Sequence, residues 1–401
     1  MKKLTTILCV TALVLSLLAG CAKEPAPTTP STEATVPSTA ATVPTTEATV
    51  PSTEATDPST EPTEPSTEPV VTIHRNPLNG TVLDEPYTGR VVAVMHNNIS
   101  QAMPQVGVSQ ADFHYEILAE GGVTRNILLY SDISKAPTLG TIRSARPYYV
   151  QIAASYDAIY VHAGGSTDAI NLISHYGLDD MDALKGSATN YFYRDSWRAE
   201  NKGYEHSLMI DSEDILACAK KLEYPLERPD GVDFGLQFAE DVALDGQDVT
   251  SIKVQFSKYG KTTTFKYYGD ENLYYARQHG GAYIDGSTNQ QLSFTNVLVL
   301  VADTTTNSDN YTLTIDLVGE GEGWFSCGGK TVPIRWSRDS ETGPFAYTLE
   351  DGTPVTFGVG RSFVAIVPQY GTVDFEYAAK AAHMGCFFAC LGFHVIAGPR
   401  L

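Results

Sequence analysis

The spacing of apolar and polar residues changes twice along the chain. An apolar run from Leu4 to Ala19 is followed by residues 22–69, which hold almost no large apolar side chains. From about Asn76 onward, apolar residues recur at every second position or at helical spacing. This pattern predicts a leader, a linker and a folded region long enough for two domains or one large one.

Short apolar runs open the folded region. Residues 90–97, RVVAVMHN, combine apolar and β-branched side chains and predict a buried strand. Residues 111–132 predict two more strands, and Gly121 with Gly122 between them indicates a hairpin turn. Residues 157–165, DAIYVHAGG, predict a further strand that ends near a double glycine.

Segments with helical spacing lie between and after these strands. One predicted helical face is apolar: Tyr149, Ile152, Ala153 and Tyr156. Pro147 suits the first turn of that helix. Ser166 as N-cap and Gly177 as stop predict a second helix, and Asp211 or Ser212 caps another over residues 211–224. Hairpins mixed with helices favour an α+β fold over a regular parallel βαβ series.

The second half of the folded region alternates with period two. Short β-like segments cover residues 251–256, 262–268, 296–302, 311–318, 330–337, 345–350, 353–357 and 362–368. Turn signals at 328–329 and 351–352 indicate hairpins, so a mostly antiparallel β-rich region is expected. Val332, Ile334 and Trp336 fall on one face of their strand, which assigns that face to the core.

The leader has the features of a bacterial lipoprotein signal. Lys2 and Lys3 precede the apolar run, which closes on small residues and Cys21. Residues 1–20 are therefore interpreted as a signal peptide, with Cys21 as the lipidation site and membrane lipid as its partner. An ordinary secretory signal or a membrane-spanning helix is the alternative, but the run is shorter than the roughly 20 residues that span a bilayer. The expected location is the extracytoplasmic side of the cell membrane.

The linker and the C-terminal tail carry little structural information. Residues 21–69 repeat a seven-residue pattern of Thr, Pro, Ser and Glu, such as EATVPST, which favours a disordered tether. Residues 376–401 are apolar and contain Cys386 and Cys390. A docked helix, a membrane or partner segment and an altered reading frame all remain open for this tail.

Charge and cysteine content exclude several classes of function. The formal net charge of −20 argues against a nucleic-acid partner, because such binding requires clustered Lys and Arg. Cys218, Cys327, Cys386 and Cys390 form no CxxC and no disulfide framework. The nine histidines show no HExxH motif, so no metal is expected, and no cofactor motif is present.

Several segments in this order are similar to the YerB-like lipoproteins of Gram-positive bacteria. The matching segments include RNPLNGTVLDE (75–85), LGTIRSARPYYVQIAASYDAIYVHAGGS (139–166), LEDGTPVTFGVG (349–360) and SFVAIVP (362–368). The resemblance implies an N-terminal domain at 74–225 and a β-rich C-terminal domain at 235–372. It also implies a three-layer β-β-α sandwich for the N-terminal part. It brings no established activity.

Two segments of the N-terminal half carry the candidate chemistry. Arg143 and Arg146 lie at the entrance of the first predicted helix, where guanidinium groups suit a carboxylate or phosphate. Pairing with internal acids such as Glu116, Glu120 or Asp157 is the structural alternative. The second segment ends a strand and starts a helix, and a crevice there often binds ligands; its candidates are His162, Gly164, Gly165 and Ser166. Arg125, on the second hairpin strand, completes this set.

A polar loop between helices supplies the remaining candidates. Arg194 and His206 could contact a ligand, and a solvated loop of this composition would look the same. If the protein is a hydrolase, His162 or His206 would act as acid or base, with Asp195 or Glu205 as partner.

The leading hypothesis from sequence is a non-enzymatic, lipid-anchored envelope protein. Its cleft, lined by Arg, His and Gly, would bind an anionic or sugar-like ligand from the cell wall or envelope. A cell-wall hydrolase and an interaction module without a pocket are the alternatives. Convergence of Arg143, Arg146, His162 and His206 on one pocket would distinguish them.

Overall fold

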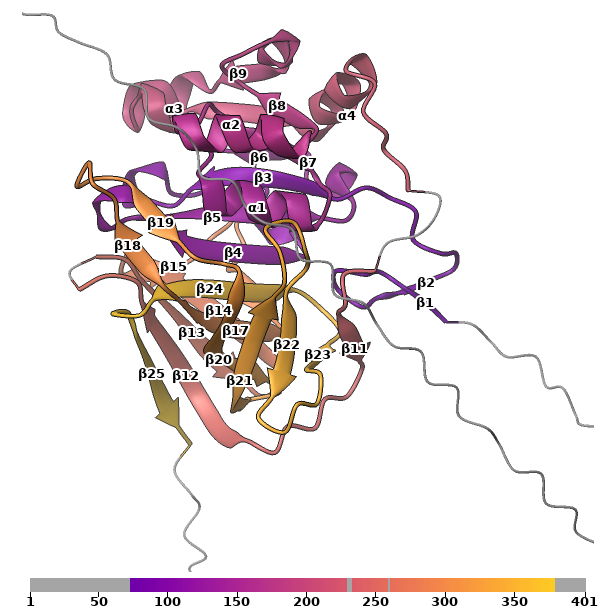
Figure 1. The fold of residues 1–401 in the computed structure, drawn as a ribbon, viewed down its shortest axis with the longest axis vertical. Coiled ribbons are helices and arrows are strands. Elements are labelled where there is room, and N and C mark those ends of the chain that lie inside the picture. The colour runs from indigo at the N-terminus through magenta and orange to yellow at the C-terminus, as the bar shows by residue number, and fades with distance from the viewer. Residues whose placement is uncertain (1–72, 229–232, 259, 379–401) are drawn as a thin grey trace, which may run out of the picture. The chain divides into compact units, whose positions relative to one another are not determined.

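One continuous β-sheet runs through both halves of the chain (Figure 1). The structure is a computed structural model that describes residues 73–228, 233–258 and 260–378, all within one compact unit. The expected signal, tether and tail beyond Ala378 lie outside these residues. Within the described ranges, no helix is long and apolar enough to cross a membrane.

The sheet follows a long path from the C-terminal half into the N-terminal half. Its order is β15 (Gly281–Ala282), β14 (Leu273–Gln278), β13 (Thr262–Tyr268), β12 (Gln247–Gln255), β21 (Lys330–Arg338), β20 (Gly319–Cys327), β17 (Asn296–Ala302), β24 (Ser362–Pro368), β4 (Phe113–Leu118), β5 (Thr124–Tyr130), β3 (Val92–Asn97), β7 (Ile159–His162) and β8 (Asp180–Asp182). Side branches are β16 (Ser293–Phe294) on β14, β22 (Ala346–Leu349) on β21 and β25 (Thr372–Tyr377) on β12. Parallel pairing of β24 with β4 joins the two halves.

Four short pairs or triples of strands complete the β structure. They are β1 (His74–Arg75) with β2 (Val82–Leu83), β6 (Thr138–Gly140) with β10 (Leu208–Asp211) and β9 (Phe192–Arg194), β11 (Gln237–Ala239) with β23 (Thr356–Gly358), and β18 (Thr304–Thr306) with β19 (Leu313–Ile315). The described structure is therefore an α+β fold in which strands dominate. The three-layer sandwich stays an expectation from the family resemblance.

The helices lie mostly in the N-terminal half. They are α1 (Pro147–Ser155), α2 (Thr167–Tyr176), α3 (Ser196–Asn201) and α4 (Ser212–Lys221). Pro147 occupies the first position of α1, Ser166 accepts a bond from the N–H of Ala169, and Gly177 ends α2 in the left-handed region, as predicted. Asp211 precedes α4, but its carboxylate makes no capping bond and instead accepts from the hydroxyl of Thr138 at 2.7 Å.

Parallel pairing is more extensive than the sequence interpretation allowed. β3, β7 and β8 are parallel neighbours, and α2 connects β7 to β8 as a βαβ unit. β3 and β4 also run in the same direction, because both pair antiparallel with β5. The prediction of an α+β fold over a regular parallel βαβ series holds, because this one βαβ unit stands beside antiparallel pairs, but the four strands β3, β4, β7 and β8 share one direction. As a result, the carboxyl ends of β3, β4, β7 and β8 lie at the same edge of the sheet, a common place for ligands.

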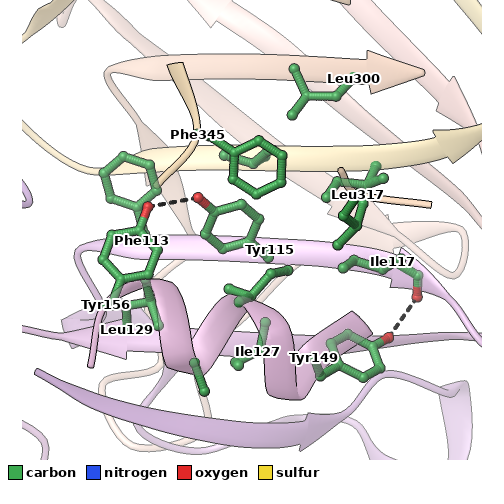
Figure 2. Packing of buried hydrophobic residues seen from close by; sticks show 14 of the residues in the cluster. Phe113, Tyr115, Ile117, Ile127, Leu129, Tyr149, Tyr156, Leu300, Leu317 and Phe345 are labelled. Carbon is green, nitrogen blue, oxygen red and sulfur yellow. Dashed lines mark hydrogen bonds between the residues drawn. The ribbon is translucent and has the colours of Figure 1, made fainter. Parts of the chain in front are cut away.

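Apolar side chains of α1 pack on one face of the central strands. Figure 2 shows Tyr149 and Tyr156 of this segment against Tyr115, Ile117 and neighbouring residues of β4 and β5. The hydroxyls of Tyr115 and Tyr156 are hydrogen-bonded at 2.7 Å, and Tyr149 donates to the carbonyl of Ile117 at 2.9 Å. The hydrogen bonds to these partners offset the cost of removing the hydroxyls from water, so the tyrosines can fill the core.

Strand predictions succeed for several segments with clear alternation, and glycine hides one of the strands that were not predicted. The structure confirms the hairpin β4–β5, the buried strand β3 and the buried face that holds Val332, Ile334 and Trp336. β20 was missed because its first half reads GEGEG. A Cβ at Gly321 would lie 2.4 Å from the Trp336 indole nitrogen, so glycine is required there by the neighbouring strand.

Candidate functional site

The segment 141–146 crosses the carboxyl ends of β3 and β7. The N–H of Arg143 donates to the carbonyl of Met95 at 3.0 Å, and the carbonyl of Arg143 accepts from Ala163 at 3.0 Å. The N–H of Ala145 donates to Gly164 at 2.9 Å. These bonds bring the segment with the two arginines beside the segment that follows His162.

Arg146 is held by a buried carboxylate. Its guanidinium binds both oxygens of Glu120, from Nε to Oε1 and from Nη2 to Oε2 at 2.9 Å, and the Glu120 side chain is 2% exposed. Arg125 lies on the other side of Glu120, with Nη1 at 3.5 Å from Oε2. Burial alone would raise the pKa of Glu120, but the hydrogen bonds and charges of the two arginines lower it. Glu120 therefore stays ionised, and Arg146 acts as a structural strut.

Arg143 contacts a carboxylate that faces solvent. Its Nη2 lies 3.2 Å from Oε2 of Glu205, whose side chain is 68% exposed. The other oxygen of Glu205 lies 3.3 Å from Nε2 of His206, and Nδ1 of His206 lies 2.9 Å from the Asn97 amide nitrogen. Burial and the nearby Arg143 charge lower the pKa of His206, so its ring is neutral at pH 7. Because the amide donates to Nδ1, the ring proton lies on Nε2 and faces Glu205.

The polar loop places one more arginine near Arg143. Arg194 donates to the carbonyl of Tyr204 at 2.6 Å and lies over the Tyr204 ring at 4.2 Å. Its charge acts on Arg143, as does that of Arg125. Asp195 accepts from the N–H of Arg198 at 2.7 Å and caps α3.

The candidates after β7 make internal contacts. His162 is fully buried, with Nδ1 at 2.9 Å from the Gly164 carbonyl and Nε2 at 3.0 Å from Asp180. The N–H of Gly164 donates to Asp182 at 2.7 Å, and Gly164 adopts a φ of +62°. A Cβ at Gly165 would lie 3.2 Å from the Cβ of Ala145, so Gly165 allows the two segments to approach.

The structure thus brings some candidates together and separates others. Arg125, Arg143 and Arg146, here called the arginine cluster, interact electrostatically with one another or through Glu120. Arg194 and His206 border this cluster, whereas His162 is directed towards Asp180. Arg146 and Ser166 also line a separate pocket of about 290 Å³ next to β19.

Sequence reasoning missed a buried ion pair between the two halves. Nζ of Lys261 lies 2.7 Å from Oε1 of Glu116, and both side chains are at most 4% exposed. Burial lowers the pKa of Lys261, and the charge of Glu116 opposes this shift. A signal was available, because Glu116 interrupts the apolar strand FHYEIL and a buried charge requires a partner. Among the described residues, no cluster of His, Cys, Asp or Glu suits a metal ion.

The chain matches a family that has two domains. Residues 78–225 match the N-terminal domain and residues 252–364 the C-terminal domain of the protein family of unknown function DUF3048. The chain therefore belongs to this family, and the expected resemblance to YerB-like proteins is confirmed.

Two comparisons give the relatives. The chain is 27% identical over 297 residues to the putative lipoprotein YerB of Bacillus subtilis strain 168, covering 73% of this chain and 86% of that protein. The crystal structure of YerB protein from Bacillus subtilis matches with a TM-score of 0.65 at 24% identity, over 75% of this chain and 99% of that one. This structural likeness shows the fold.

Proposed function

We propose that this protein is a lipid-anchored component of the bacterial envelope, held on the outer side of the membrane by Cys21. The basic residues, apolar run and terminal cysteine of the leader support this proposal, as does similarity to a putative lipoprotein. Replacing Cys21 by Ala should abolish incorporation of labelled fatty acid and release the protein from membranes. Labelled, membrane-bound Cys21→Ala protein would refute the anchor.

The ligand proposed for the arginine cluster is an anion, either a carboxylate or a phosphate. The three arginines of the cluster have two carboxylate partners, Glu120 and Glu205, so the cluster carries an excess of positive charge. This local excess contrasts with the net charge of −20 of the whole chain. Guanidinium groups bind such anions through paired, charge-assisted hydrogen bonds. The cluster lies at the carboxyl ends of parallel strands, where ligands often bind.

The observation that carries this proposal is the exposure of Glu205. An anion that displaced Glu120 from Arg146 would have to enter a buried site, whereas Glu205 can swing into water at small cost because its side chain is 68% exposed. Arg143 would then offer its guanidinium to the ligand, with Arg125 and Arg194 adding positive charge nearby. Glu205 is therefore the internal competitor of the ligand.

This competition makes the experiment specific. Inorganic phosphate and a short poly(glycerol phosphate) would be titrated calorimetrically into the protein and its variants. Arg143→Ala should weaken binding about tenfold or more, because a hydrogen bond to a charged group is lost. Glu205→Ala should instead strengthen binding, because the competing carboxylate is gone.

A matched exposed pair provides the control. Arg335 and Glu322 lie 3.9 Å apart on the β21–β20 hairpin, and both are exposed. Arg335→Ala and Glu322→Ala should leave binding of both anions unchanged. Unchanged affinity in Arg143→Ala, or weaker binding in Glu205→Ala, would refute the anion site.

The hydrolase alternative is less well supported. Nε2 of His206 lies 3.3 Å from Glu205, but both ring nitrogens of His206 have partners and its side chain is 5% exposed. A general base needs a free lone pair within reach of a substrate proton. Release of reducing sugars or new amino groups from purified cell wall, abolished by His206→Gln, would favour the hydrolase instead.

A further inference from the structure

A pocket of about 630 Å³ opens between the parts of the chain that match the two family domains. The N-terminal part contributes residues 98–101, which follow β3, and residues 121–123 of the β4–β5 turn. The C-terminal part contributes residues 260–262 and 279–280, on either side of β13 and β14. The pocket volume falls in the range of small-molecule sites, which often lie between domains.

The floor of this pocket is a hydrogen-bonded ion pair without net charge. Lys261 lines it and is paired with the buried Glu116, which also accepts from the side chains of Asn98, Thr124 and Thr263 at 2.6–2.8 Å. Lys261 donates to Thr263 as well, at 2.6 Å. The two charges cancel, so the floor offers fixed polar groups and no net charge.

The walls carry groups that both donate and accept hydrogen bonds. Gln101 provides an amide, Ser100 and Thr262 provide hydroxyls, and none of the described lining residues is acidic. Burial and the charge of Lys261 lower the pKa of His279, which is therefore neutral at pH 7. Amides and hydroxyls complement ligand hydroxyls, which also donate and accept. An ionic ligand finds no compensating charge here.

A second depression continues the pocket. It has a volume of about 440 Å³ and shares Ser100 and His279 with the first. Its walls are more apolar and include Met103, Pro104 and Ile284. Oε1 of Gln278, a residue 6% exposed, has no hydrogen-bond partner within the described ranges. A buried acceptor without a partner is costly, and a ligand N–H would satisfy it.

We propose that the interdomain pocket and its adjoining depression bind an uncharged saccharide that carries acetamido groups. The sugar hydroxyls contact the amide and hydroxyl side chains of the larger pocket. The acetamido N–H donates to Gln278, and its methyl group packs in the apolar depression. This proposal goes beyond the proposed function, because the pocket and the depression are lined by other residues than the arginine cluster.

Features of the walls favour a saccharide over a peptide. Extended peptides need separate pockets for alternate side chains. The larger pocket is instead bounded by backbone at Gly121, Gly122, Gly260 and Gly280. An added Cβ at Gly121 or Gly280 would meet no atom within 4 Å, so these walls are open to a broad ring.

Calorimetric titration with tri-N-acetylchitotriose tests the proposal. Maltotriose, which has the hydroxyls but no acetamido group, and trialanine, a neutral peptide backbone, are the comparison probes. We expect saturable binding of the acetamido trimer and at least tenfold weaker binding of both others. No saturable binding of the trimer up to about 10 mM, or equal binding of maltotriose or trialanine, would overturn the proposal.

Substitutions in the walls locate the binding. Gln101→Trp places a large ring in the pocket from an exposed position and should weaken trimer binding about tenfold. Thr262→Val removes one hydroxyl at nearly constant shape and should weaken it about threefold. Gln247→Trp and Thr305→Val, both at exposed positions on other strands, should have no effect.

These variants also separate the two proposals. Gln101→Trp should leave phosphate binding unchanged, and Arg143→Ala should leave trimer binding unchanged. Each variant should melt close to the parent protein, because surface substitutions rarely change stability much. Trimer binding that is unchanged in Gln101→Trp would overturn the interdomain site even if the anion site is confirmed.

Discussion

Arg146 and Arg143 lie three residues apart in sequence and hold carboxylates in opposite environments. Arg146 binds both oxygens of Glu120, whose side chain is 2% exposed, whereas Arg143 makes a 3.2 Å contact with Glu205, whose side chain is 68% exposed. Removing one partner of a buried ion pair lowers the stability of a protein strongly, whereas removing one partner of an exposed pair lowers it little. Burial of the acid therefore decides which arginine is fixed to its partner and which can release it into water at small cost.

The pair of Lys261 and Glu116 extends the buried side of this comparison. It joins strands from the two halves of the chain, and hydrogen bonds from Asn98, Thr124 and Thr263 surround it. Such a pair adds specificity to the contact between the halves only while both partners are present. Removing one partner should therefore cost the most stability at this buried pair and the least at exposed pairs.

Lys261→Met should have the largest effect. It leaves the buried Glu116 without its cationic partner, so the free energy of unfolding should fall by about 3–5 kcal/mol in urea denaturation. Lys330→Met removes an exposed pair with Asp248, 2.9 Å long, and should cost less than about 1 kcal/mol. The double variant Glu116→Gln/Lys261→Met should recover part of the loss. Equal effects of Lys261→Met and Lys330→Met would contradict the contrast.

Arg146→Ala should cause the second largest loss of stability. It removes the bidentate partner of Glu120 but leaves Arg125 at 3.5 Å, so the remaining charge is partly compensated. We expect a loss of about 2–3 kcal/mol, measured in the same denaturation experiment. Arg146→Lys should lose less, since it keeps the charge and one contact. A loss below that of the exposed control Arg335→Ala would show that Arg146 is no strut.

Acidification should destabilise the protein through a buried histidine. Burial lowers the pKa of the fully buried His96 from 6.5 to about 4. Below pH 6.5 this histidine is protonated in the unfolded state but still neutral in the folded state. Stability therefore falls as the pH drops from about 6.5 towards 4. This group alone should cost about 2 kcal/mol between pH 7 and pH 5.

The variant His96→Leu isolates this contribution. It introduces an apolar side chain of similar size and removes the titrating group, so the decline of stability between pH 7 and pH 5 should become shallower by about 2 kcal/mol. Urea denaturation at several pH values gives the slope. A slope identical to that of the parent protein would assign the pH dependence to other groups.

Local patterns predicted the elements better than their partners. Ser166 and Gly177 marked the ends of α2, and Gly121 with Gly122 marked the β4–β5 turn, because capping and turn chemistry depends on neighbouring residues. The parallel pairing of β24 with β4 joins residues far apart in sequence, and no local pattern encodes it. The same limit hid the pair of Glu116 and Lys261, 145 positions apart.

The candidate site shows this limit in its side chains. Sequence spacing placed Arg143 and Arg146 at the start of α1, and α1 does begin at Pro147. The spacing did not determine which acid pairs with each arginine, and Glu120 was one of three internal acids considered. His162 follows a strand as expected, but its contact with Asp180 depends on the register of β7 and β8. The spacing of residues in the sequence therefore indicates candidate site residues, and the contacts formed in the fold determine which of their side chains remain accessible.

The smallest effect on stability is expected at the exposed pair. A double-mutant cycle of Arg143→Ala and Glu205→Ala should give a coupling energy below about 1 kcal/mol, because the 3.2 Å contact lies beside a carboxylate in water. The corresponding cycle of Arg146→Ala and Glu120→Ala should give a larger one, because Glu120 is buried. If the Arg143 cycle matches or exceeds the Arg146 cycle, Glu205 is a structural partner that a ligand cannot displace. If the coupling is small and phosphate binding still responds in opposite directions to the two single variants, Arg143 is the ligand-facing arginine.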